Sequence, residues 1–430
     1  MQTQVETLEG LTRRITLQLN MAEIESEVDR RLKRLVKTVR MDGFRPGKAP
    51  LKVVAQRYGG EIRGEVMGEA LQRGFLEATR ANNLNVVGYP RFDRAQEAEA
   101  AFTATFEVFP EITLGDVSQI KVTRPQVEVT EADVERTLDI LRKQRIHYHA
   151  VEREAREGDR VHVDYVGRID GNPFPGGEAK DYPVVLGEGR TLKDFEGQLV
   201  GMRPDERKTF EVTFPEDYFA KVLAGKTAQF EVHMKSVREP HLPAVDEAFA
   251  RSLGIHDGDV AKLRKEIAAN LRREAKRRIQ AKVKEQVMQG LLEATPFEVP
   301  KALVAMESQV LLDRAVNDLK ARGMKETDIH LKAEVFEPQA KRRVALSLLL
   351  NEIARTQGIR AEPDQVKALV EEFAQSYEDP AEVVAWYYQD ANRLREAESL
   401  VLEDNIVNWV LERAQVTDQP MTIEALMGNA

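Results

Sequence analysis

The first apolar residues of the chain change from a period of two to a helical period. Apolar and polar residues alternate over 15–19, which predicts a strand after a turn at Gly10. Asn20 and Glu23 then form a capping-box pattern, which predicts the start of a helix that runs to about Arg40. The apolar face of this helix consists of Ile24, Val28, Leu32, Leu35, Val36 and Val39.

A second helix is expected to begin at Pro50, to break at Gly59-Gly60 and to resume as far as Arg80. Alternating apolar residues over 102–108 then predict a strand. A hairpin, two helices and a further strand indicate an α+β (α/β) domain, which we place at residues 1–112.

The next segment, residues 113–150, is expected to be a linker with one helix that starts at Thr130. Beyond it the pattern changes to short strands separated by turns, and Asp170-Gly171 has the composition of a hairpin turn. We expect a compact β-rich domain at residues 151–243.

Residues 244–430 are predicted to be helical almost throughout, because apolar residues recur at helical spacing between clear start and stop signals. The stop and start signals are Gly323, Gly358, Pro300, Pro363 and Pro380. The fold class is therefore a multi-domain α+β chain with an all-helical C-terminal domain that carries long arms.

One helix in this region has an unusual apolar stripe. Its apolar residues recur at every fourth position, so the stripe advances about 40° per step around a helix of 3.6 residues per turn. The stripe consists of Leu263, Ile267, Leu271, Ala275, Ile279, Val283, Val287 and Leu291. It predicts a long arm whose two ends face different neighbours, or a right-handed supercoil. An ordinary core helix is the alternative.

Composition limits the kinds of protein that the chain can be. A chain of 430 residues is long enough for about three domains, and 42% apolar residues are ample for their cores. The first residues do not resemble a signal peptide, and the longest apolar run is far too short to span a membrane. With no cysteine, disulfides and thiolate chemistry are excluded, which fits a cytoplasmic protein. We expect no membrane partner.

Positive charge is concentrated in one window. The chain has a net charge of −9, yet residues 30–57 contain ten cations and a single anion, Asp42. Those cations are Arg30, Arg31, Lys33, Arg34, Lys37, Arg40, Arg45, Lys48, Lys52 and Arg57. An acidic protein with one strongly basic region is suited to touch a polyanion at one place. A solvated helix face, or a site for free nucleic acid, is the alternative.

Common catalytic signatures fail on inspection. Gly225-Lys226-Thr227 has Ala220 where a phosphate-binding loop needs its first glycine. Gly187-x-Gly189 has Leu192 where a dinucleotide fingerprint needs a small residue. His147 and His149 form a close pair that lacks further ligands at metal-binding spacing. We expect neither a cofactor nor a metal, and any catalysis should need no nucleophile.

The middle domain resembles a known enzyme family. The runs "GDRVHVDYVGRIDGNPFPGG", "YPVVLGEGRTLKDFEGQLVGMRPDERKTFEVTFPEDY" and "LAGKTAQFEV" resemble the FKBP family of peptidyl-prolyl isomerases. The resemblance implies a half-barrel sheet wrapped on a short helix, with an apolar pocket for a proline side chain. Carried over by position, the pocket residues are Tyr165, Phe174, Val185, Leu192, Phe195, Tyr218, Leu223 and Phe230.

The basic window carries a second resemblance. The stretch "GFRPGKAP" matches the G-F-R-x-G-K-x-P signature of trigger factor, the ribosome-associated chaperone family of bacteria. The order of the domains is similar too, so the resemblance covers the whole chain. It implies binding to the large ribosomal subunit near the exit tunnel, against both protein and RNA. The ribosome-binding residues would be Gly43, Phe44, Arg45, Gly47 and Lys48.

The same resemblance implies an ATP-independent cytoplasmic chaperone that shields nascent and unfolded polypeptides in a helical cradle. It allows a homodimer when the protein is off the ribosome. Candidate client contacts are Met324, Phe336, Trp386, Tyr387 and Tyr388. The alternative is a dedicated prolyl isomerase whose flanking domains serve dimerisation or tethering.

Overall fold

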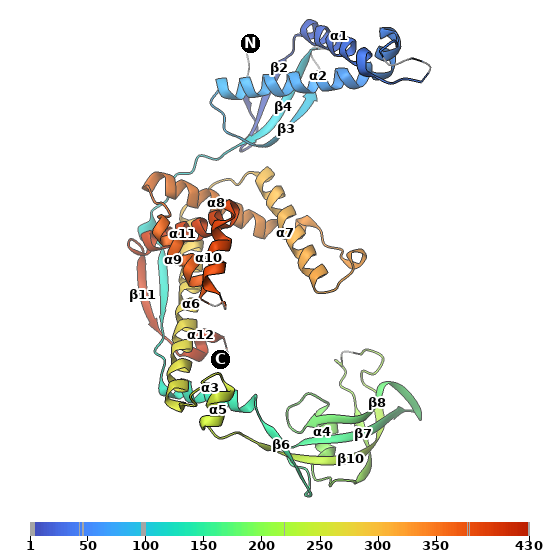
Figure 1. The fold of residues 1–430 in the computed structure, drawn as a ribbon, viewed down its shortest axis with the longest axis vertical. Coiled ribbons are helices and arrows are strands. Elements are labelled where there is room, and N and C mark those ends of the chain that lie inside the picture. The colour runs from blue at the N-terminus through green and yellow to red at the C-terminus, as the bar shows by residue number, and fades with distance from the viewer. Residues whose placement is uncertain are drawn as a thin grey trace. The chain divides into compact units, whose positions relative to one another are not determined.

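The structure is a computed structural model that divides the chain into two compact units. One unit contains Met1–Arg124 and Gln280–Gln419, and the other contains Pro125–Ile279 and Pro420–Ala430. The residues that the structure describes are 5–42, 44, 47–95, 100–218, 220–375, 377 and 379–428. Figure 1 labels the elements. The domain boundaries given above stay predictions.

The N-terminal part of the first unit is a four-stranded antiparallel sheet with two helices. The strand order is β1-β2-β4-β3. The elements are β1 (Val5–Thr7), β2 (Thr12–Gln18), α1 (Met21–Thr38), α2 (Leu51–Ala81), β3 (Val86–Arg94) and β4 (Ala101–Val108). Asn20 caps α1, because its side-chain oxygen accepts from the backbone N–H of Ala22 at 3.2 Å. Its amide nitrogen donates to Glu23 at 2.8 Å, so the predicted pair forms through the two side chains.

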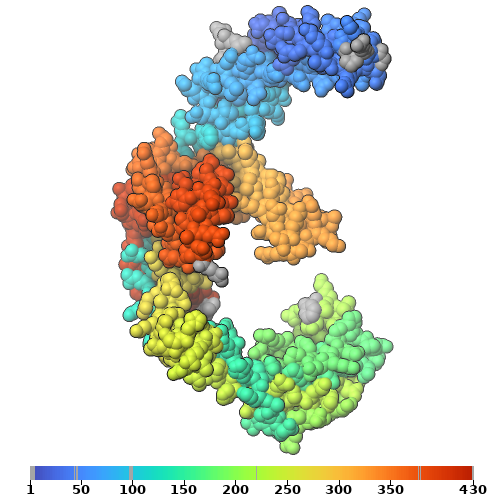
Figure 2. Space-filling view, viewed as in Figure 1, coloured from blue at the N-terminus to red at the C-terminus, as the bar shows by residue number. Residues whose placement is uncertain are grey.

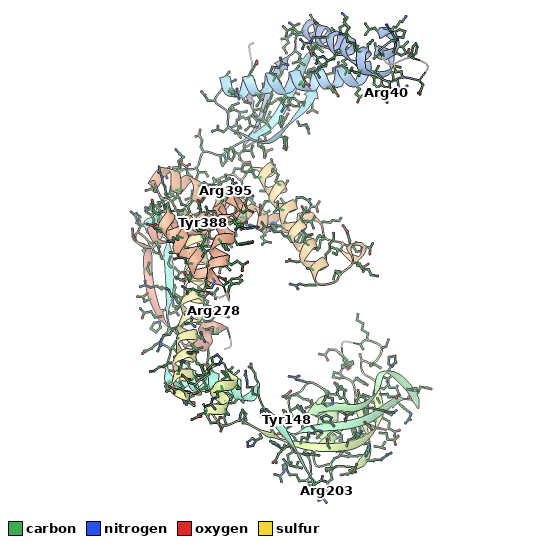
Figure 3. The ribbon with its side chains drawn as sticks, in the orientation of Figure 1. Arg40, Tyr148, Arg203, Arg278, Tyr388 and Arg395 are labelled. Atoms are coloured by element: carbon green, nitrogen blue, oxygen red, sulfur yellow. The ribbon has the colours of Figure 1, made fainter. Side chains whose placement is uncertain are left out.

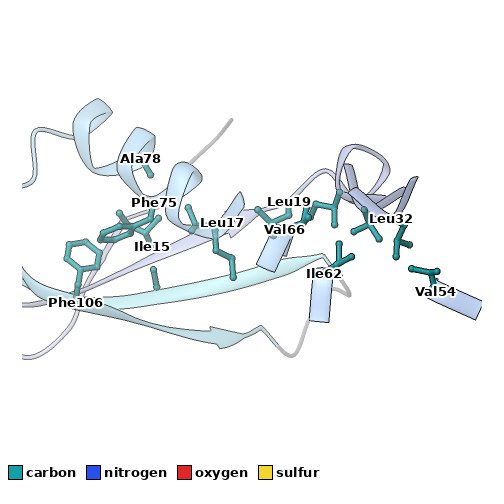
Figure 4. Close-up of a cluster of buried hydrophobic side chains, with 14 of the residues drawn as sticks. Ile15, Leu17, Leu19, Leu32, Val54, Ile62, Val66, Phe75, Ala78 and Phe106 are labelled. Carbon is teal, nitrogen blue, oxygen red and sulfur yellow. The ribbon is translucent and has the colours of Figure 1, made fainter. Parts of the chain in front are cut away.

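The core of this part lies between the helices and one face of the sheet. Ile15 and Leu17 of β2 point into it together with Phe106 of β4, and all three are buried. Val54 and Val66 contribute the matching face of α2 (Figure 4). The alternation in β2 and the helical spacing in α1 were correct predictions, because each pattern buries one face of its element.

The predicted break in the second helix was wrong. The helix α2 runs without interruption from Leu51 to Ala81, through Gly59 and Gly60. An added Cβ at either glycine would meet no atom within 4 Å, so both glycines lie where nothing packs on them. Two glycines cost a helix about 2 kcal/mol relative to alanine. The buried apolar residues on either side of them, which pack on the core, outweigh that cost.

The second unit contains a five-stranded sheet. Its order is β6-β10-β7-β8. The fifth strand, β9, pairs with the first half of β10, and β6 pairs with the second half along the same edge. The strands are β6 (His147–Val151), β7 (Arg160–Ile169), β8 (Asn172–Val185), β9 (Arg207–Thr213) and β10 (Thr227–His241). The short helix α4 (Lys193–Leu199) packs on this sheet (Figure 1). Its residues Phe195 and Leu199 are buried in the core. Asp170 and Gly171 form the predicted two-residue hairpin turn, both with positive φ, at 52° and 79°.

Helix α3 (Glu131–Lys143) in the same unit begins with the predicted capping box. The Asp133 carboxylate accepts from the backbone N–H and the hydroxyl of Thr130, at 2.8 and 2.7 Å. Val134 and Leu138 are buried against Phe249 of α5 (Glu247–Ser252).

Helix α6 (Val260–Ala294) is the helix with the every-fourth-residue stripe, and its two ends have different neighbours. Leu263 and Ile267 near its start are buried in the cluster that also holds Leu138 of α3. Near its end, Gly290 lies against Ile120. The predicted arm with two sets of neighbours is therefore confirmed.

The remaining helices belong mostly to the first unit. They are α7 (Lys301–Ala321), α8 (Glu337–Gln357), α9 (Pro363–Ala374), α10 (Pro380–Tyr388) and α11 (Ala391–Leu411), together with α12 (Ile423–Met427) of the second unit. Two short 3-10 helices, η2 (Glu326–Asp328) and η3 (Ala333–Phe336), precede α8, and η1 (Val117–Gln119) precedes β5. The predicted stops were correct: Gly358 ends α8 with a positive φ of 68°.

One strand pair was missed. β11 (Gln415–Pro420), in the region predicted to be helical, pairs with β5 (Lys121–Gln126) of the linker. Over the described residues, no helix is both long enough and apolar enough to cross a membrane.

Candidate functional site

Four aromatic side chains predicted for the pocket meet on one face of the five-stranded sheet. Tyr165 of β7 lies 5.6 Å from Phe195 of α4 and 5.9 Å from Phe230 of β10, measured between ring centroids. Phe195 and Phe230 are 5.2 Å apart. Phe174 of β8 joins them edge-on to Phe230 at 6.3 Å. Three strands and the short helix therefore each contribute one ring.

Three of the four remaining predicted side chains extend this group. Tyr218 lies 4.9 Å from Phe214, whose ring is in turn 5.9 Å from Phe174. Leu192 and Leu223 are half-buried against the same core. We call the following set the aromatic cluster: Tyr165, Phe174, Phe195, Phe210, Phe214, Tyr218 and Phe230.

Val185 lies apart from the other predicted pocket residues. Its neighbours Val184 and Leu186 are both buried in the core under the aromatic cluster, whereas Val185 is half-buried and is not packed there. Side chains alternate between the two faces of a strand, so Val185 lies on the face away from the cluster.

Two glycines make room for the rings. Gly167 of β7 is directly opposite Phe230 in the strand pairing, and an added Cβ would lie 2.6 Å from the Phe230 ring. An added Cβ at Gly177 of β8 would lie 2.9 Å from the Phe174 ring. The rings of the cluster thus occupy space that any other residue at these positions would fill.

The sequence reasoning missed several residues of this site. Tyr182 lies edge-on to Tyr165, with ring centroids 5.8 Å apart, and is 40% exposed. Phe210 lies 5.6 Å from Phe195. Both aromatic residues lie in strands with alternating apolar residues, but this alternation does not distinguish an aromatic ring in the core from one that faces a ligand. Glu196, beside Phe195, was also missed.

The surroundings of Tyr165 and Glu196 shift the pKa of each side chain. Burial raises the pKa of Tyr165, with smaller contributions from Tyr182 and Tyr218. Its hydroxyl is therefore neutral at physiological pH. Burial alone would raise the pKa of Glu196, but hydrogen bonds from Thr191 and the glycines before it outweigh burial and lower that pKa. Glu196 is therefore ionised although it is only 5% exposed.

Such a cluster can act on a neutral substrate without acid or base chemistry. The barrier to rotation of a prolyl peptide bond is about 18–20 kcal/mol, because amide resonance must be lost. An apolar surface of fixed shape that excludes water can bind the twisted amide better than either planar form.

A second candidate site is the turn between α1 and α2. Phe44 is 39% exposed although it is apolar, and its N–H donates to the carbonyl of Met41 at 3.1 Å. Gly47 has a φ of 78°, and an added Cβ there would lie 3.3 Å from the carbonyl oxygen of Lys37. Lys48 is exposed. The predicted residues Gly43 and Arg45 lie outside the described residues.

The cations around this turn fall into two groups. Arg30 and Arg31 pair with Glu27, and Arg31 also pairs with Glu65 and Glu69. The other cations that the structure describes are exposed, and no ion pair is found for them within the described part of the chain. We call them the basic face: Lys33, Arg34, Lys37, Arg40, Lys48, Lys52 and Arg57. Figure 3 labels Arg40, near the turn that joins the two helices. Positive charge is thus left unneutralised around Phe44.

Residues of metal-ligating type do not gather in the part of the chain that the structure describes. The structure's described residues contain no group of three or more histidines, cysteines or acidic residues placed to hold a metal ion. The ring of His149 instead lies 5.7 Å from that of His241.

The candidate client contacts of the helical region divide by exposure. Met324, Trp386 and Tyr388 are 45 to 49% exposed, whereas Phe336 and Tyr387 are partly buried against their neighbours. Figure 2 shows the surface over α9 to α11 in orange and red, and Figure 3 labels Tyr388 within it.

Models of known protein families match three segments of the chain. The family described as "Bacterial trigger factor protein (TF)" matches residues 1–141, and its C-terminal counterpart matches 259–412. The family described as "FKBP-type peptidyl-prolyl cis-trans isomerase" matches residues 151–235.

Individual relatives match over the full length of the chain. Trigger factors of Aromatoleum aromaticum and Nitrosospira multiformis are each 52% identical, across 100% of both chains. A solved structure described as "Promiscuous Substrate Recognition in Folding and Assembly Activities of the Trigger Factor Chaperone" is 19% identical, with a TM-score of 0.47 over 96% of this chain and 99% of that one.

Proposed function

Because the chain belongs to the trigger factor family, we propose that the aromatic cluster is its prolyl-isomerase site and the turn at Phe44 its ribosome contact. The chain is an ATP-independent, ribosome-associated chaperone that binds nascent polypeptides, and its FKBP-type domain is a peptidyl-prolyl cis-trans isomerase.

The convergence of rings from β7, β8, β10 and α4 is the observation that supports the isomerase site most strongly. The proline ring of a client packs against Tyr165, Phe195 and Phe230, with Leu192 beside them. Removal of water and the fixed shape of these walls favour the twisted amide over both planar forms.

A pair of matched truncations tests this site. Leu192→Ala should lower kcat/KM for a proline-containing peptide by about tenfold, because a wall of the pocket is lost. Val185→Ala, which also shortens an apolar side chain next to the same core, should leave kcat/KM within about twofold. Equal effects of the two substitutions would place the site elsewhere in the domain.

The ribosome contact combines an apolar anchor with surrounding charge. Phe44 is exposed in the turn between α1 and α2, and the exposed cations of the basic face precede and follow it in sequence, in an otherwise acidic chain. A ring among unpaired cations is suited to a target made of both protein and RNA. We place that target on the large subunit near the exit tunnel, with Phe44 against protein and Arg45 and Lys48 against RNA.

The remaining partners follow from the same role. Nascent and unfolded chains contact dispersed apolar side chains of the helical region, of which Met324, Trp386 and Tyr388 are exposed. A protein that works on emerging chains at bacterial ribosomes is cytoplasmic. Off the ribosome we expect a homodimer, which sedimentation of the free protein over a range of concentrations tests.

A further inference from the structure

The Gly187-x-Gly189 pattern, which fails as a dinucleotide fingerprint, binds an anion within the protein itself. Both glycines have positive φ, at 91° and 67°. Their backbone N–H groups donate to one oxygen of the Glu196 carboxylate, at 2.9 and 3.4 Å. Successive N–H groups that converge in this way form a concave anion site. Here the anion is a side chain of α4.

The other carboxylate oxygen of Glu196 is held by the same loop. Thr191 donates to it twice, from its backbone N–H at 3.1 Å and from its hydroxyl at 2.8 Å. Across the described residues, no lysine or arginine forms an ion pair with Glu196. A buried charge is tolerated only when it is well hydrogen-bonded, so the loop and the carboxylate hold each other in place.

The segment fixed in this way leads directly into the proposed pocket. Leu192 lies between the loop at 187–191 and the first residue of α4. Phe195 follows about one helical turn later. The backbone N–H of Glu196 itself donates to the carbonyl of Leu192 at 3.0 Å. Side chain and backbone of Glu196 thus hold both ends of the segment that carries Leu192.

We propose that Glu196 is a positioning residue for X–Pro isomerisation, which fixes the 187–191 loop and thereby the Leu192 and Phe195 wall of the pocket. The proposal rests on the proposed isomerase site. It gives Glu196 no contact with the substrate and no proton transfer. Its effect on the rate is through shape, because catalysis by differential binding requires walls held within a fraction of an ångström.

Three variants of the full-length chain test this role. Glu196→Gln keeps the size of the side chain but replaces one acceptor oxygen by a donor, so it cannot hold all four hydrogen bonds. Asp159→Asn is the control, because Asp159 is a buried carboxylate of the same domain that holds Arg153 and the Arg156 N–H. Leu192→Ala reports on the pocket independently of Glu196.

For Glu196→Gln we expect kcat/KM, corrected for the folded fraction, to fall about tenfold. The amides of Gly187, Gly189 and Thr191 should exchange faster at the same time. Asp159→Asn should lower thermal stability and leave kcat/KM within about twofold. If Glu196 had a purely structural role, Glu196→Gln would behave like Asp159→Asn: thermal stability would fall and kcat/KM would stay unchanged. That result would overturn the proposal.

Two further results separate the remaining explanations. If Leu192→Ala has no effect, the isomerase site itself is misplaced; if Leu192→Ala is impaired but Glu196→Gln is not, only the positioning role is wrong. Should Glu196→Gln fail to fold, Thr191→Val decides. It removes one hydroxyl donor and should lower kcat/KM by about two- to threefold, and an unchanged value contradicts the proposal.

Discussion

Gly167 lies directly opposite Phe230 in the pairing of β7 with β10, and the Phe230 ring occupies the space where a side chain would be. We expect Gly167→Ala to destabilise the FKBP-type domain by about 1–3 kcal/mol, because the new methyl group would lie 2.6 Å from the ring. Thermal unfolding followed by near-UV circular dichroism measures this. Gly171→Ala cannot serve as the control, because Gly171 has a positive φ and alanine would be strained there whatever its neighbours.

Glu196 should make the stability of the same domain depend on pH. Its pKa in the folded protein is lowered from the ordinary 4.5. The ionised carboxylate therefore contributes stability that is complete above pH 4.5 and is lost as the pH falls through the lowered value. Glu196→Gln should flatten this part of the profile, as measured by thermal unfolding between about pH 7 and about pH 3. If Glu196→Gln lost stability at acid pH in the same way as wild type, this prediction would be contradicted.

Single residues were predictable where local chemistry decides their conformation. The cap at Thr130 and Asp133 and the turn at Asp170-Gly171 depend only on neighbours in sequence, and both form as expected. The buried partner of Gly187 and Gly189 was not predictable, because a glycine pattern indicates an anion site but not which anion fills it. Nor did the sequence distinguish Val185 from Val184, since both are apolar and adjacent.

Helix α2 illustrates the same limit for a whole element. The Gly59-Gly60 pair is a local signal for a break, but packing of Val54 and Ile62 on the core keeps the helix continuous. The pairing of strands β5 and β11 could not be predicted from the sequence for a related reason. Each is short, and Gln415 donates to the carbonyl of Ile120 almost 300 residues earlier, a contact that no local pattern encodes.

Glycine substitutions in two helices test this account with opposite signs. Gly59→Ala in α2 should stabilise that helix by about 0.5–1 kcal/mol, because the new Cβ meets nothing and a flexible residue is removed. Gly290→Ala in α6 should destabilise instead, since its Cβ would lie 2.5 Å from the Ile120 side chain. Amide exchange within each helix gives the two values. A destabilising Gly59→Ala would mean that α2 needs flexibility at this point.

At the scale of the whole molecule, the fold class and the family were accessible from the sequence. The compact units were not, because each is built from segments that are far apart in the chain. The long helix α6 starts in one unit and ends in the other, and its winding apolar stripe was the only sequence feature that anticipated two sets of neighbours. Charge also acts at this scale, since the basic face belongs to a chain whose net charge is −9.

Co-sedimentation with ribosomes tests the proposed contact most directly. Replacement of Phe44, Arg45 and Lys48 together by alanine should abolish co-sedimentation, while prolyl-isomerase activity stays within about twofold of wild type. Binding of the wild-type protein should also weaken as salt is added, because cations of the basic face release counterions from RNA phosphates. Alanine at Arg30 and Arg31, which are already paired with acidic residues, provides the control. If the triple variant still co-sediments like wild type, this turn is not the ribosome contact.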